Sequence, residues 1–524
     1  MANNKLTGSF YTPHKLIEYM VGYVSKRIKP CSILEPSAGD GRFVSLLLKF
    51  NAPITLVEFE PDKANNLSAQ FGEECSVWVG DFLKYSLEHE AQYDLIIGNP
   101  PYITKKTLPD DQCTRSLKLV QQFNLNATLF QNLWVSFILA SLKLLSSTGS
   151  IFFVLPFEFL QVQYAEKLRI FLEDKFNTIE ITTFEDRVFT DIEQDVCLVY
   201  LANEATAKPF IRYTTLKSES DTTITFSSVI MRNKPLKKWS NCILNDEETE
   251  ALQRIALNYP KIGSLGDIAP GIVTGANSFF ILPQSRIEQF ELPINSALPV
   301  LMKSSAIMQL LLFTQEDFSV ISETTTPTYV LDLSNLKRSE FNSILAAHIK
   351  YGKKKKIHKR YKCRSRGRWF DVPLVKKGAA CFFKRFHIFP RVIVNQADVY
   401  TTDIAYNIRF HNGYTAPSFA FCFYNSLTLA LCEYNGRFYG GGVGELVPSE
   451  FKSLHIPYKT IADDDIQLLD KMIRDNEDMQ TIVDYVDSIV LSDLSEENIK
   501  LLQTIRTRYV SRRMKTFIIE QNEE

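Results

Sequence analysis

The first 205 residues predict an α/β domain with a mostly parallel sheet, and the rest of the chain predicts a second, mixed β-rich domain followed by helices. Up to about residue 205, short apolar runs alternate with helical patterns, which is typical of strand–helix–strand crossovers. Between 265 and 457 the chain has short strands, many turns and no long helical period. From residue 463 an acidic stretch leads into apolar residues at helical spacing, which predicts a C-terminal helical segment.

Seven apolar runs are the candidate strands of the first domain. They cover residues 32–34, 54–59, 77–79, 94–97, 150–155, 178–183 and 196–201. Helical patterns cover residues 42–50, 61–71, 129–145 and 164–176. Residues 208–245 are polar and basic, and we interpret them as a connector with a strand or two. The predicted division is a first domain over 1–240, a second over 250–460 and a helical segment over 461–524.

Length, charge and cysteine content limit the class of protein. A chain of 524 residues is too long for one ordinary core and predicts two or three domains. The formal net charge of −1 excludes a uniformly basic surface, so any nucleic-acid contact must come from a local patch. The nine cysteines are scattered without zinc-like spacing, which favours a reducing cytoplasm and predicts neither a disulfide framework nor a metal site. The polar N-terminus and the interrupted apolar segments predict neither a signal peptide nor a membrane span.

A glycine-containing loop and two acidic residues follow the first three candidate strands. The loop from Glu35 to Phe43 opens a helix, and its two glycines allow a ligand to approach the backbone closely. Glu58 and Asp81 stand at the ends of the next two strands, where open α/β sheets bind nucleotide-like ligands. Taken singly, these residues have ordinary interpretations as turn glycines, a solvated strand end and a helix cap. No Gly-Lys-Ser/Thr phosphate loop is present, which argues against ATP hydrolysis.

The tetrapeptide Asn99-Pro100-Pro101-Tyr102 follows the fourth candidate strand. Its two prolines fix the backbone and remove two donors, so that carbonyl oxygens and the Asn99 amide oxygen are free to accept hydrogen bonds. The ring of Tyr102 offers a flat surface beside them, although an ordinary turn aromatic is the alternative interpretation. This rigid turn, Asn99 to Tyr102, is called the bracket below. It suits a planar substrate with an exocyclic NH2 group, which could be adenine, cytosine or a carboxamide.

In this order the motifs resemble S-adenosylmethionine-dependent DNA N6-adenine methyltransferases of restriction–modification type, in the gamma arrangement of the Eco57I-like methylase family. The resemblance covers most of the chain and implies a Rossmann-like, seven-stranded methyltransferase sheet with helices on both faces, followed by a target recognition domain. Phe10 to Pro13 match the N-terminal motif that closes over the methionine part of the cofactor. The segments 271–277 and 440–446 resemble those that bound the recognition region.

The resemblance also implies roles for individual residues. The cofactor-binding residues that it implies are Tyr11, Thr12, Pro13, Glu35, Pro36, Ser37, Ala38, Gly39, Glu58, Phe59, Asp81, Phe82, Asn99 and Pro101. In catalysis, the Asn99 amide oxygen and the Pro100 carbonyl would accept hydrogen bonds from the two N6 hydrogens of adenine. Tyr102 would stack on the flipped base, and Phe189 would contact its opposite face.

Residues 353–368 form a concentrated basic segment, which holds ten Lys or Arg residues, no acid, and is followed by Trp369-Phe370. In a chain of nearly zero net charge this pattern favours phosphate binding, and the alternative is a solvated charge run or flexible loop. The predicted DNA-binding residues are Lys353, Lys354, Lys355, Lys356, Lys359, Arg360, Arg364, Arg366 and Arg368. The arginines among them could also read guanine edges.

The sequence therefore predicts a site-specific adenine methyltransferase that takes its methyl group from S-adenosylmethionine and acts on double-stranded DNA as a monomer. A bacterial or archaeal cytoplasm is its expected location, and a separate cognate restriction endonuclease is its expected partner. Methylation of another planar NH2 group (cytosine N4, RNA guanine N2 or protein glutamine) is one alternative. A non-catalytic DNA-binding specificity subunit is the other.

Overall fold

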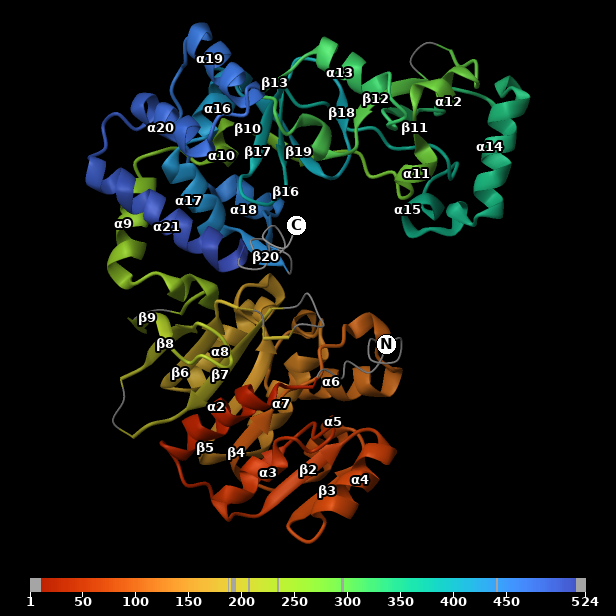
Figure 1. Cartoon of the computed structure of the whole chain (residues 1–524). Helices are drawn as coiled ribbons and strands as arrows, with labels where there is room; N and C mark the ends of the chain where they lie inside the picture. Colours follow the sequence, from red (N-terminus) through yellow and green to blue (C-terminus); the bar gives the residue numbers. More distant parts are fainter. Residues whose placement is uncertain are drawn as a thin grey trace. The chain divides into compact units, whose positions relative to one another are not determined.

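A computed structural model describes residues 11–186, 188–189, 195–205, 208–232, 235–293, 296–439 and 442–514 (Figure 1). The chain divides into two compact units. The first holds Met1–Thr249, Phe438–Gly442 and Arg512–Glu524, and the second holds Glu250–Arg437 and Val443–Ser511. The three-part division expected from the sequence stays a prediction, because a division by contacts describes compactness and not independent folding.

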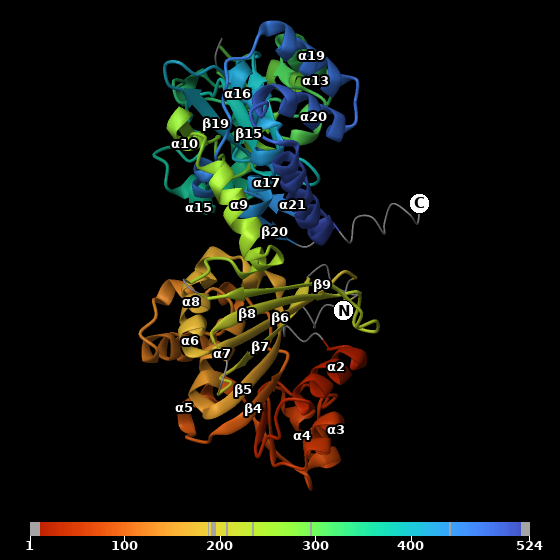
Figure 2. The ribbon, with the colours of Figure 1, turned by 90° about the vertical axis from the view of Figure 1, so that its left-hand side faces the viewer.

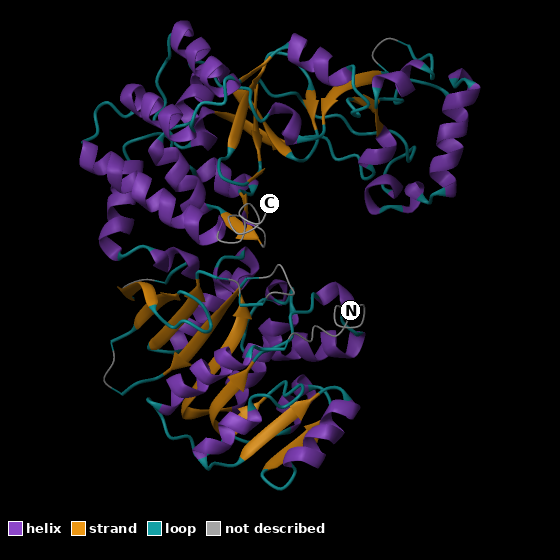
Figure 3. Ribbon diagram, viewed as in Figure 1, coloured by secondary structure: helices purple, strands orange, loops and turns teal. Residues whose placement is uncertain are grey.

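A nine-stranded sheet forms the centre of the first unit (Figure 3). Its spatial order is β3-β2-β1-β4-β5-β7-β6-β8-β9. The strands are β1 Ile33–Glu35, β2 Ile54–Glu58, β3 Cys75–Val79, β4 Tyr93–Gly98, β5 Leu145–Pro156, β6 Thr178–Phe184, β7 Val196–Ala202, β8 Phe210–Leu216 and β9 Ile224–Met231. The first seven confirm the predicted strands. The last two are the strands expected within the connector at 208–245, and they extend the expected seven-stranded sheet to nine strands.

The register of the sheet brings four strand ends to one edge. Strand β1 pairs in parallel with both β2 and β4, and β2 pairs in parallel with β3. Strand β7 is antiparallel to its neighbours β5 and β6. Because the chain runs outward in opposite directions from β1 and β4, their carboxyl ends border the crevice in which open α/β sheets bind ligands.

Helices cover both faces of this sheet, with α2, α3 and α4 on one side and α5, α6, α7 and α8 on the other (Figure 2). Their bounds are α2 His14–Ser25, α3 Val44–Leu47, α4 Pro61–Phe71, α5 Phe82–Glu88, α6 Asp110–Gln122, α7 Leu133–Leu144 and α8 Glu166–Lys175. Helix α4 confirms the predicted range, whereas the predicted helix over 42–50 is α3 followed by one 3-10 turn, Leu48–Phe50. The sequence did not indicate α2, α5 or α6.

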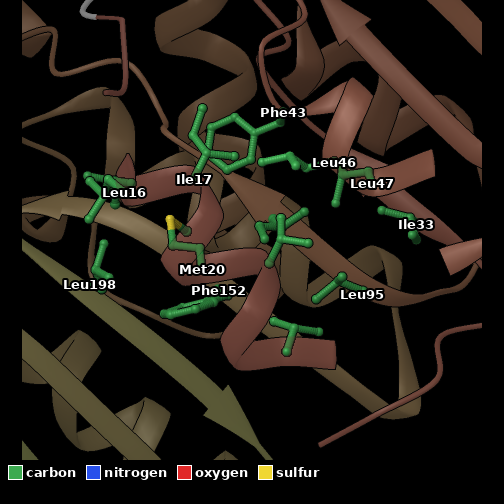
Figure 4. Packing of buried hydrophobic residues seen from close by; sticks show 14 of the residues in the cluster. Leu16, Ile17, Met20, Ile33, Phe43, Leu46, Leu47, Leu95, Phe152 and Leu198 are labelled. Carbon is green, nitrogen blue, oxygen red and sulfur yellow. The ribbon is translucent and has the colours of Figure 1, made fainter. Parts of the chain in front are cut away.

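The buried face of α2 anchors the N-terminal part of the first unit to the sheet. Leu16, Ile17 and Met20 have no exposed surface and pack with Phe152 of β5 and Leu198 of β7 (Figure 4). Burial of one such aliphatic side chain contributes roughly 1.5–3 kcal/mol. This packing fixes the start of α2, and with it the residues just before the helix.

The second unit combines small sheets with helices. One sheet has the order β10-β19-β15-β17-β13 and another has the order β11-β14-β12-β18. These strands are β10 Gly266–Pro270, β11 Ile281–Leu282, β12 Ala297–Leu301, β13 Leu312–Phe313, β14 Tyr329–Leu331, β15 Ala380–Phe383, β17 Arg391–Asn395, β18 Tyr400–Thr401 and β19 Ala405–Phe410. The longer helices are α13 Gln315–Ser322, α14 Ser343–Lys354, α16 Ala416–Phe423, α17 Ser426–Asn435, α19 Asp463–Arg474, α20 Met479–Val490 and α21 Glu496–Met514.

The expectation of no long helical period between 265 and 457 was wrong. Helix α14 has 12 residues and α17 has 10, and α16 lies directly before α17. Helices α16 and α17 are buried on almost every side, so they lack the alternation of polar and apolar faces that marks a surface helix. In the sequence of α14, the lysines at the end of the helix obscure the apolar periodicity of Leu345 and Ile349.

No helix in the described part of the chain is long and apolar enough to cross a membrane. Within the same residues, no group of three His, Cys, Asp or Glu side chains could hold a metal ion. All nine cysteines are free thiols.

Candidate active site

A cavity of about 300 Å³ lies at the carboxyl ends of β1, β2, β3 and β4. Among its lining residues are Tyr11, Thr12, Glu35, Pro36, Ser37, Ala38, Gly39, Glu58, Phe59, Asp81, Phe82, Asn99 and Pro101. The fold thus brings together the predicted cofactor residues, apart from Pro13, which precedes α2 without lining the cavity. Phe10, which belongs to the same N-terminal motif, lies outside the described residues.

The loop after β1 wraps around the carboxylate of Glu58. Gly39 has φ +60° and Gly41 has φ +78°, which are left-handed conformations that favour glycine. A Cβ on Gly41 would lie 2.6 Å from the side chain of Leu67, so the close approach to α4 also requires glycine. The backbone N–H of Gly39 donates to Glu58 Oε2 at 2.7 Å, and that of Glu60 donates to Glu58 Oε1 at 2.9 Å.

Glu58 keeps acceptor capacity for a ligand. Each of its oxygens holds one backbone donor, and a carboxylate oxygen can accept a second hydrogen bond. Burial raises the pKa of Glu58, and the two backbone hydrogen bonds oppose that rise because they favour the ionised form. The arrangement suits a pair of neighbouring hydroxyl groups, such as those of a ribose.

Glu35 is a buried carboxyl with an unused oxygen. It is 1% exposed, and its Oε2 has no hydrogen-bond partner within the described residues. Burial raises the pKa of Glu35 well above its ordinary value, and repulsion from Asp40 and Glu58 adds to the effect. A buried carboxylate needs a cationic or hydrogen-bonding partner. The orphaned oxygen therefore fits a positively charged ligand, and S-adenosylmethionine carries both a sulfonium and an ammonium group.

Asp81 and two phenylalanines form the part of the cavity next to β3. The Asp81 carboxylate caps α5 by accepting a hydrogen bond from the N–H of Leu83 at 3.0 Å. The rings of Phe82 and Phe137 both line the cavity, with their centroids 5.0 Å apart. An apolar wall beside a carboxylate fits a flat heterocycle with an amino group, such as the adenine of the cofactor.

The amide of Asn99 is held in one orientation. Its Nδ2 donates to Thr12 Oγ1 at 3.2 Å, and its Oδ1 accepts from the hydroxyl of Tyr102 at 2.9 Å. The same hydroxyl lies 3.1 Å from the carbonyl oxygen of Val154, and Ser37 Oγ donates to the backbone carbonyl of Asn99 at 3.0 Å. An amide oxygen has two lone pairs, so a carboxamide in this position can accept hydrogen bonds from two donors.

The structure does not place the other predicted catalytic residues in the wall of the cavity. Pro100 and Tyr102 do not line the cavity, and Tyr102 packs against the same core cluster that contains the buried Phe189. Burial raises the pKa of Tyr102 well above its ordinary value, so its hydroxyl remains a donor. Stacking of Tyr102 and Phe189 on a substrate base stays a prediction.

Several cavity residues were missed by sequence reasoning. Arg42 donates to the carbonyl of Thr12 at 2.8 Å, forms a bidentate pair with Asp40, and lies over the ring of Tyr11 at 4.7 Å. Further missed lining residues are Glu60, Lys63, Ile103, Thr107, Leu108, Pro109, Gln112, Leu133 and Phe137. A proline followed by two aspartates at 109–111 is a helix-start pattern that could have revealed α6.

The basic segment is folded and divides into two sets of cations. It comprises the end of α14, a 3-10 turn at Ile357–Lys359 and the short helix α15, Tyr361–Arg364. The exposed cations are Lys353, Lys354, Lys355, Lys356, Lys359, Arg360, Lys362 and Arg364. Arg366 and Arg368 instead donate to backbone carbonyls of the protein, at Val273 and Thr274 and at 333–336 respectively.

Of the two segments that resemble the borders of the recognition region, the first is described in full and the second in part. Residues 271–277 lie beside the basic segment, because Arg360 donates to the carbonyl of Gly275 at 3.2 Å and Arg366 lies over the ring of Phe280 at 5.5 Å. In the second segment, Gly440 and Gly441 lie outside the described residues.

Comparison with known proteins identifies relatives along most of the chain. A family model described as Eco57I restriction-modification methylase matches residues 43–189, and one described as the C-terminal domain of Type II methyltransferase M.Eco57I matches residues 236–491. Type II methyltransferase M.AccI of Acinetobacter calcoaceticus is 22% identical over 95% of this chain and 95% of that protein. Type II methyltransferase M.XamI of Xanthomonas campestris pv. amaranthicola is 23% identical over 86% of this chain and 85% of that protein.

Among solved structures, the Type IIL restriction-modification enzyme MmeI in complex with DNA matches with a TM-score of 0.57. The match covers 95% of this chain and 75% of that chain at 12% identity, so it concerns the fold alone. The two family models match successive parts of the chain, and the relatives extend over nearly all of it. The chain belongs to the Eco57I-like family of restriction-modification methylases.

Proposed function

We propose that the protein transfers the methyl group of S-adenosylmethionine to N6 of an adenine in double-stranded DNA. The observation that carries this proposal is the position of Asn99, which lines the cofactor cavity with its amide oriented by Thr12 and Tyr102. In the proposed reaction a bond forms between N6 and the methyl carbon while the bond from that carbon to sulfur breaks. S-adenosylhomocysteine leaves, and N6 releases one proton to solvent.

The bracket around Asn99 would prepare N6 for this reaction. The lone pair of N6 is delocalised into the ring, which makes the amino group a poor nucleophile. Asn99 Oδ1 and the carbonyl oxygen of Pro100 would accept the two N6 hydrogens and favour a pyramidal nitrogen. Because positive charge develops on N6 during transfer, these two acceptors stabilise the transition state more than the bound substrate.

The target base has to leave the duplex to reach this bracket. Base flipping exposes the amino group and costs unstacking energy, which aromatic contacts in the pocket can offset. Tyr102 packs against the apolar cluster that contains Phe189, and these two are the aromatic residues that we propose for these contacts. The hydroxyl of Tyr102 has a second role, since it orients the Asn99 amide.

We also propose that the exposed cations of the basic segment bind DNA phosphates. Four consecutive lysines, Lys353 to Lys356, are exposed at the end of α14. Ile357, Cys363 and Trp369 are buried in the core of the second unit and hold the segment as a folded surface. Arg360, Arg366 and Arg368 have carbonyl partners within the protein, so the proposal rests on the other cations.

Asn99→Ala is the test of the catalytic proposal. We expect methyl transfer to DNA to fall by about 10²-fold or more, because removal of one such transition-state contact has effects of that size. Binding of S-adenosylmethionine, measured by calorimetry, should change little, since most cavity residues remain. Asn66→Ala, on the exposed side of α4, is the matched control and should transfer methyl groups at the normal rate.

Two results would contradict the proposal. Transfer to DNA at a nearly normal rate by the Asn99→Ala variant would remove Asn99 from the mechanism. Normal binding of S-adenosylmethionine by the unaltered protein, with methyl transfer to RNA or protein and none to DNA, would favour the alternatives that share a planar NH2 substrate.

A further inference from the structure

Arg115 reaches from α6 to the cofactor cavity and contacts the carboxylate of Asp81. Its Nη1 lies 2.7 Å from Asp81 Oδ2, and the two residues are 34 positions apart in the sequence. Asp81 is 7% exposed and lines the cavity, whereas the side chain of Arg115 is 26% exposed. The same Nη1 lies 2.7 Å from Asp111, whose side chain is 61% exposed. Arg115 therefore joins one buried carboxylate of the cavity to one surface carboxylate of its own helix.

The contacts of Asp81 fix the direction of its carboxylate. Oδ1 accepts from the N–H of Leu83, and Oδ2 accepts from Arg115, so both oxygens are anchored on the protein side. Each oxygen keeps one further lone pair for a ligand in the cavity. Charge-assisted hydrogen bonds of this kind are shorter and about twice as strong as neutral ones.

Helix α6 also contributes directly to the wall of the cavity. Thr107, Leu108 and Pro109 precede the helix, and Gln112 lies in its first turn, and all four line the cavity. Arg115 lies one turn further along the same helix. Its ion pair with Asp81 thus ties this wall to the end of β3.

We propose that Arg115 is a positioning residue for the cofactor: it holds Asp81 ready to accept a hydrogen bond from the adenine amino group. The inference rests on the proposed contact between Asp81 and adenine. Removal of Arg115 would leave Asp81 without its cationic partner and with Oδ1 held by the N–H of Leu83 alone, so that Oδ2 loses its fixed direction. Loss of Arg115 therefore weakens the binding of the adenine part of the cofactor and raises the KM for S-adenosylmethionine. The residues around Asn99 are untouched, so kcat at a saturating concentration of S-adenosylmethionine stays unchanged.

The test compares two ligands, four variants of the ion pair and one control variant. The ligands are S-adenosylmethionine and its inosine analogue, in which a carbonyl oxygen replaces the 6-amino group. The variants are Arg115→Met, which keeps the aliphatic stem, Arg115→Lys, which restores a cation, Asp81→Asn, and the double variant Arg115→Met with Asp81→Asn. Asp111→Asn is the matched control, because it removes the exposed partner of Arg115 and leaves the buried one.

We expect Arg115→Met to bind S-adenosylmethionine about tenfold more weakly, in line with the removal of a charged hydrogen bond, and to bind the inosine analogue as the unaltered protein does. Arg115→Lys should recover part of the affinity, and Asp111→Asn should match the unaltered protein. The double variant should bind no more weakly than Asp81→Asn alone, because the two residues act as one unit.

The outcomes separate this inference from the proposals on which it rests. Unchanged affinity in Arg115→Met, or an equal decrease for both ligands that adds to the effect of Asp81→Asn, would overturn the positioning role. If Asp81→Asn keeps the preference for the amino-bearing ligand, the contact between Asp81 and adenine is wrong, and the inference falls with it. Failure of the protein to methylate DNA, with the expected binding pattern intact, would overturn the proposed function and support the role of Arg115.

Discussion

Glu35 is the residue whose ionisation should couple cofactor binding to pH. Burial raises its pKa well above the ordinary value, so in the free protein it takes up a proton at a pH where an exposed glutamate is ionised. A raised carboxyl pKa in the folded state means that the cofactor-free protein loses stability as pH rises above the pKa of the unfolded chain. A bound cation favours the ionised form of Glu35 and so reverses the preference of the free protein for the protonated form.

We therefore predict that S-adenosylmethionine binds more tightly as pH rises, by at most about tenfold per pH unit for one proton, until the pKa of Glu35 in the free protein is passed. Glu35→Gln should bind more weakly and lose most of this pH dependence, as measured by calorimetry across the pH range. Glu58 is the other cavity carboxyl with a raised pKa, so Glu58→Gln is measured beside it. Exposed Glu74→Gln is the control, and an unchanged pH profile in Glu35→Gln would refute the assignment.

Among single residues, the sequence predicted as cavity residues those that directly follow successive strands along the chain. Glu35, Glu58, Asp81 and Asn99 stand at the ends of successive parallel strands, and such ends meet at one edge of a sheet. Arg42 and Arg115 were missed because the partners that tie them to the cavity, Thr12 and Asp81, lie 30 and 34 positions away in the sequence. Their contacts depend on where a helix packs, and no local pattern encodes that.

Helix α2 is the element that carries Thr12 to Asn99. Thr12 lies two residues before the helix, and the apolar side of the helix is fully buried against the sheet. The contact between Thr12 Oγ1 and the Asn99 amide therefore depends on core packing some distance from the cavity.

Leu16→Ala should destabilise the first unit by about 2–5 kcal/mol, the usual range for a large-to-small change in a core. Cofactor affinity should fall as well, because the start of α2 loosens. Denaturant unfolding and calorimetry measure the two effects. Glu18→Ala, on the exposed side of the same helix, should change stability by less than about 0.5 kcal/mol. Equal stability of Leu16→Ala and Glu18→Ala would show that α2 does not anchor this part of the unit.

Elements were predictable where one face is apolar and the other polar. The bounds of strand β9 could not be predicted within its Thr/Ser-rich surroundings. Its exposed face includes both apolar and polar side chains, and Ile224 is 61% exposed. Helices α16 and α17 were missed for the opposite reason. They are buried on almost every side, so neither has a polar face that alternates with an apolar one. In both cases tertiary position, which the local pattern does not contain, decided the structure.

For the whole molecule, DNA binding is expected to depend on salt through the exposed cations of the basic segment. Replacement of Lys353 to Lys356 by alanine should weaken DNA binding. It should also reduce the slope of log affinity against log salt by about 0.9 for each phosphate that the variant no longer neutralises. Fluorescence anisotropy across a salt series measures both quantities.

The matched control replaces four exposed lysines of the first unit, Lys84, Lys118, Lys167 and Lys175, and changes the net charge by the same amount. This variant should keep the normal salt slope. If the slope falls equally in the two quadruple variants, the effect belongs to net charge and the basic segment has no special role in binding DNA. The expected monomer and the separate cognate endonuclease stay predictions.

The identity of the methylated base tests the central claim most directly. DNA from a host without adenine methylation of its own, expressing either the protein or its Asn99→Ala variant, is digested to nucleosides and analysed by mass spectrometry. We predict N6-methyldeoxyadenosine in DNA from cells with the unaltered protein and none above background with the variant. N4-methyldeoxycytidine as the product, or equal N6-methyldeoxyadenosine from both proteins, would contradict the account.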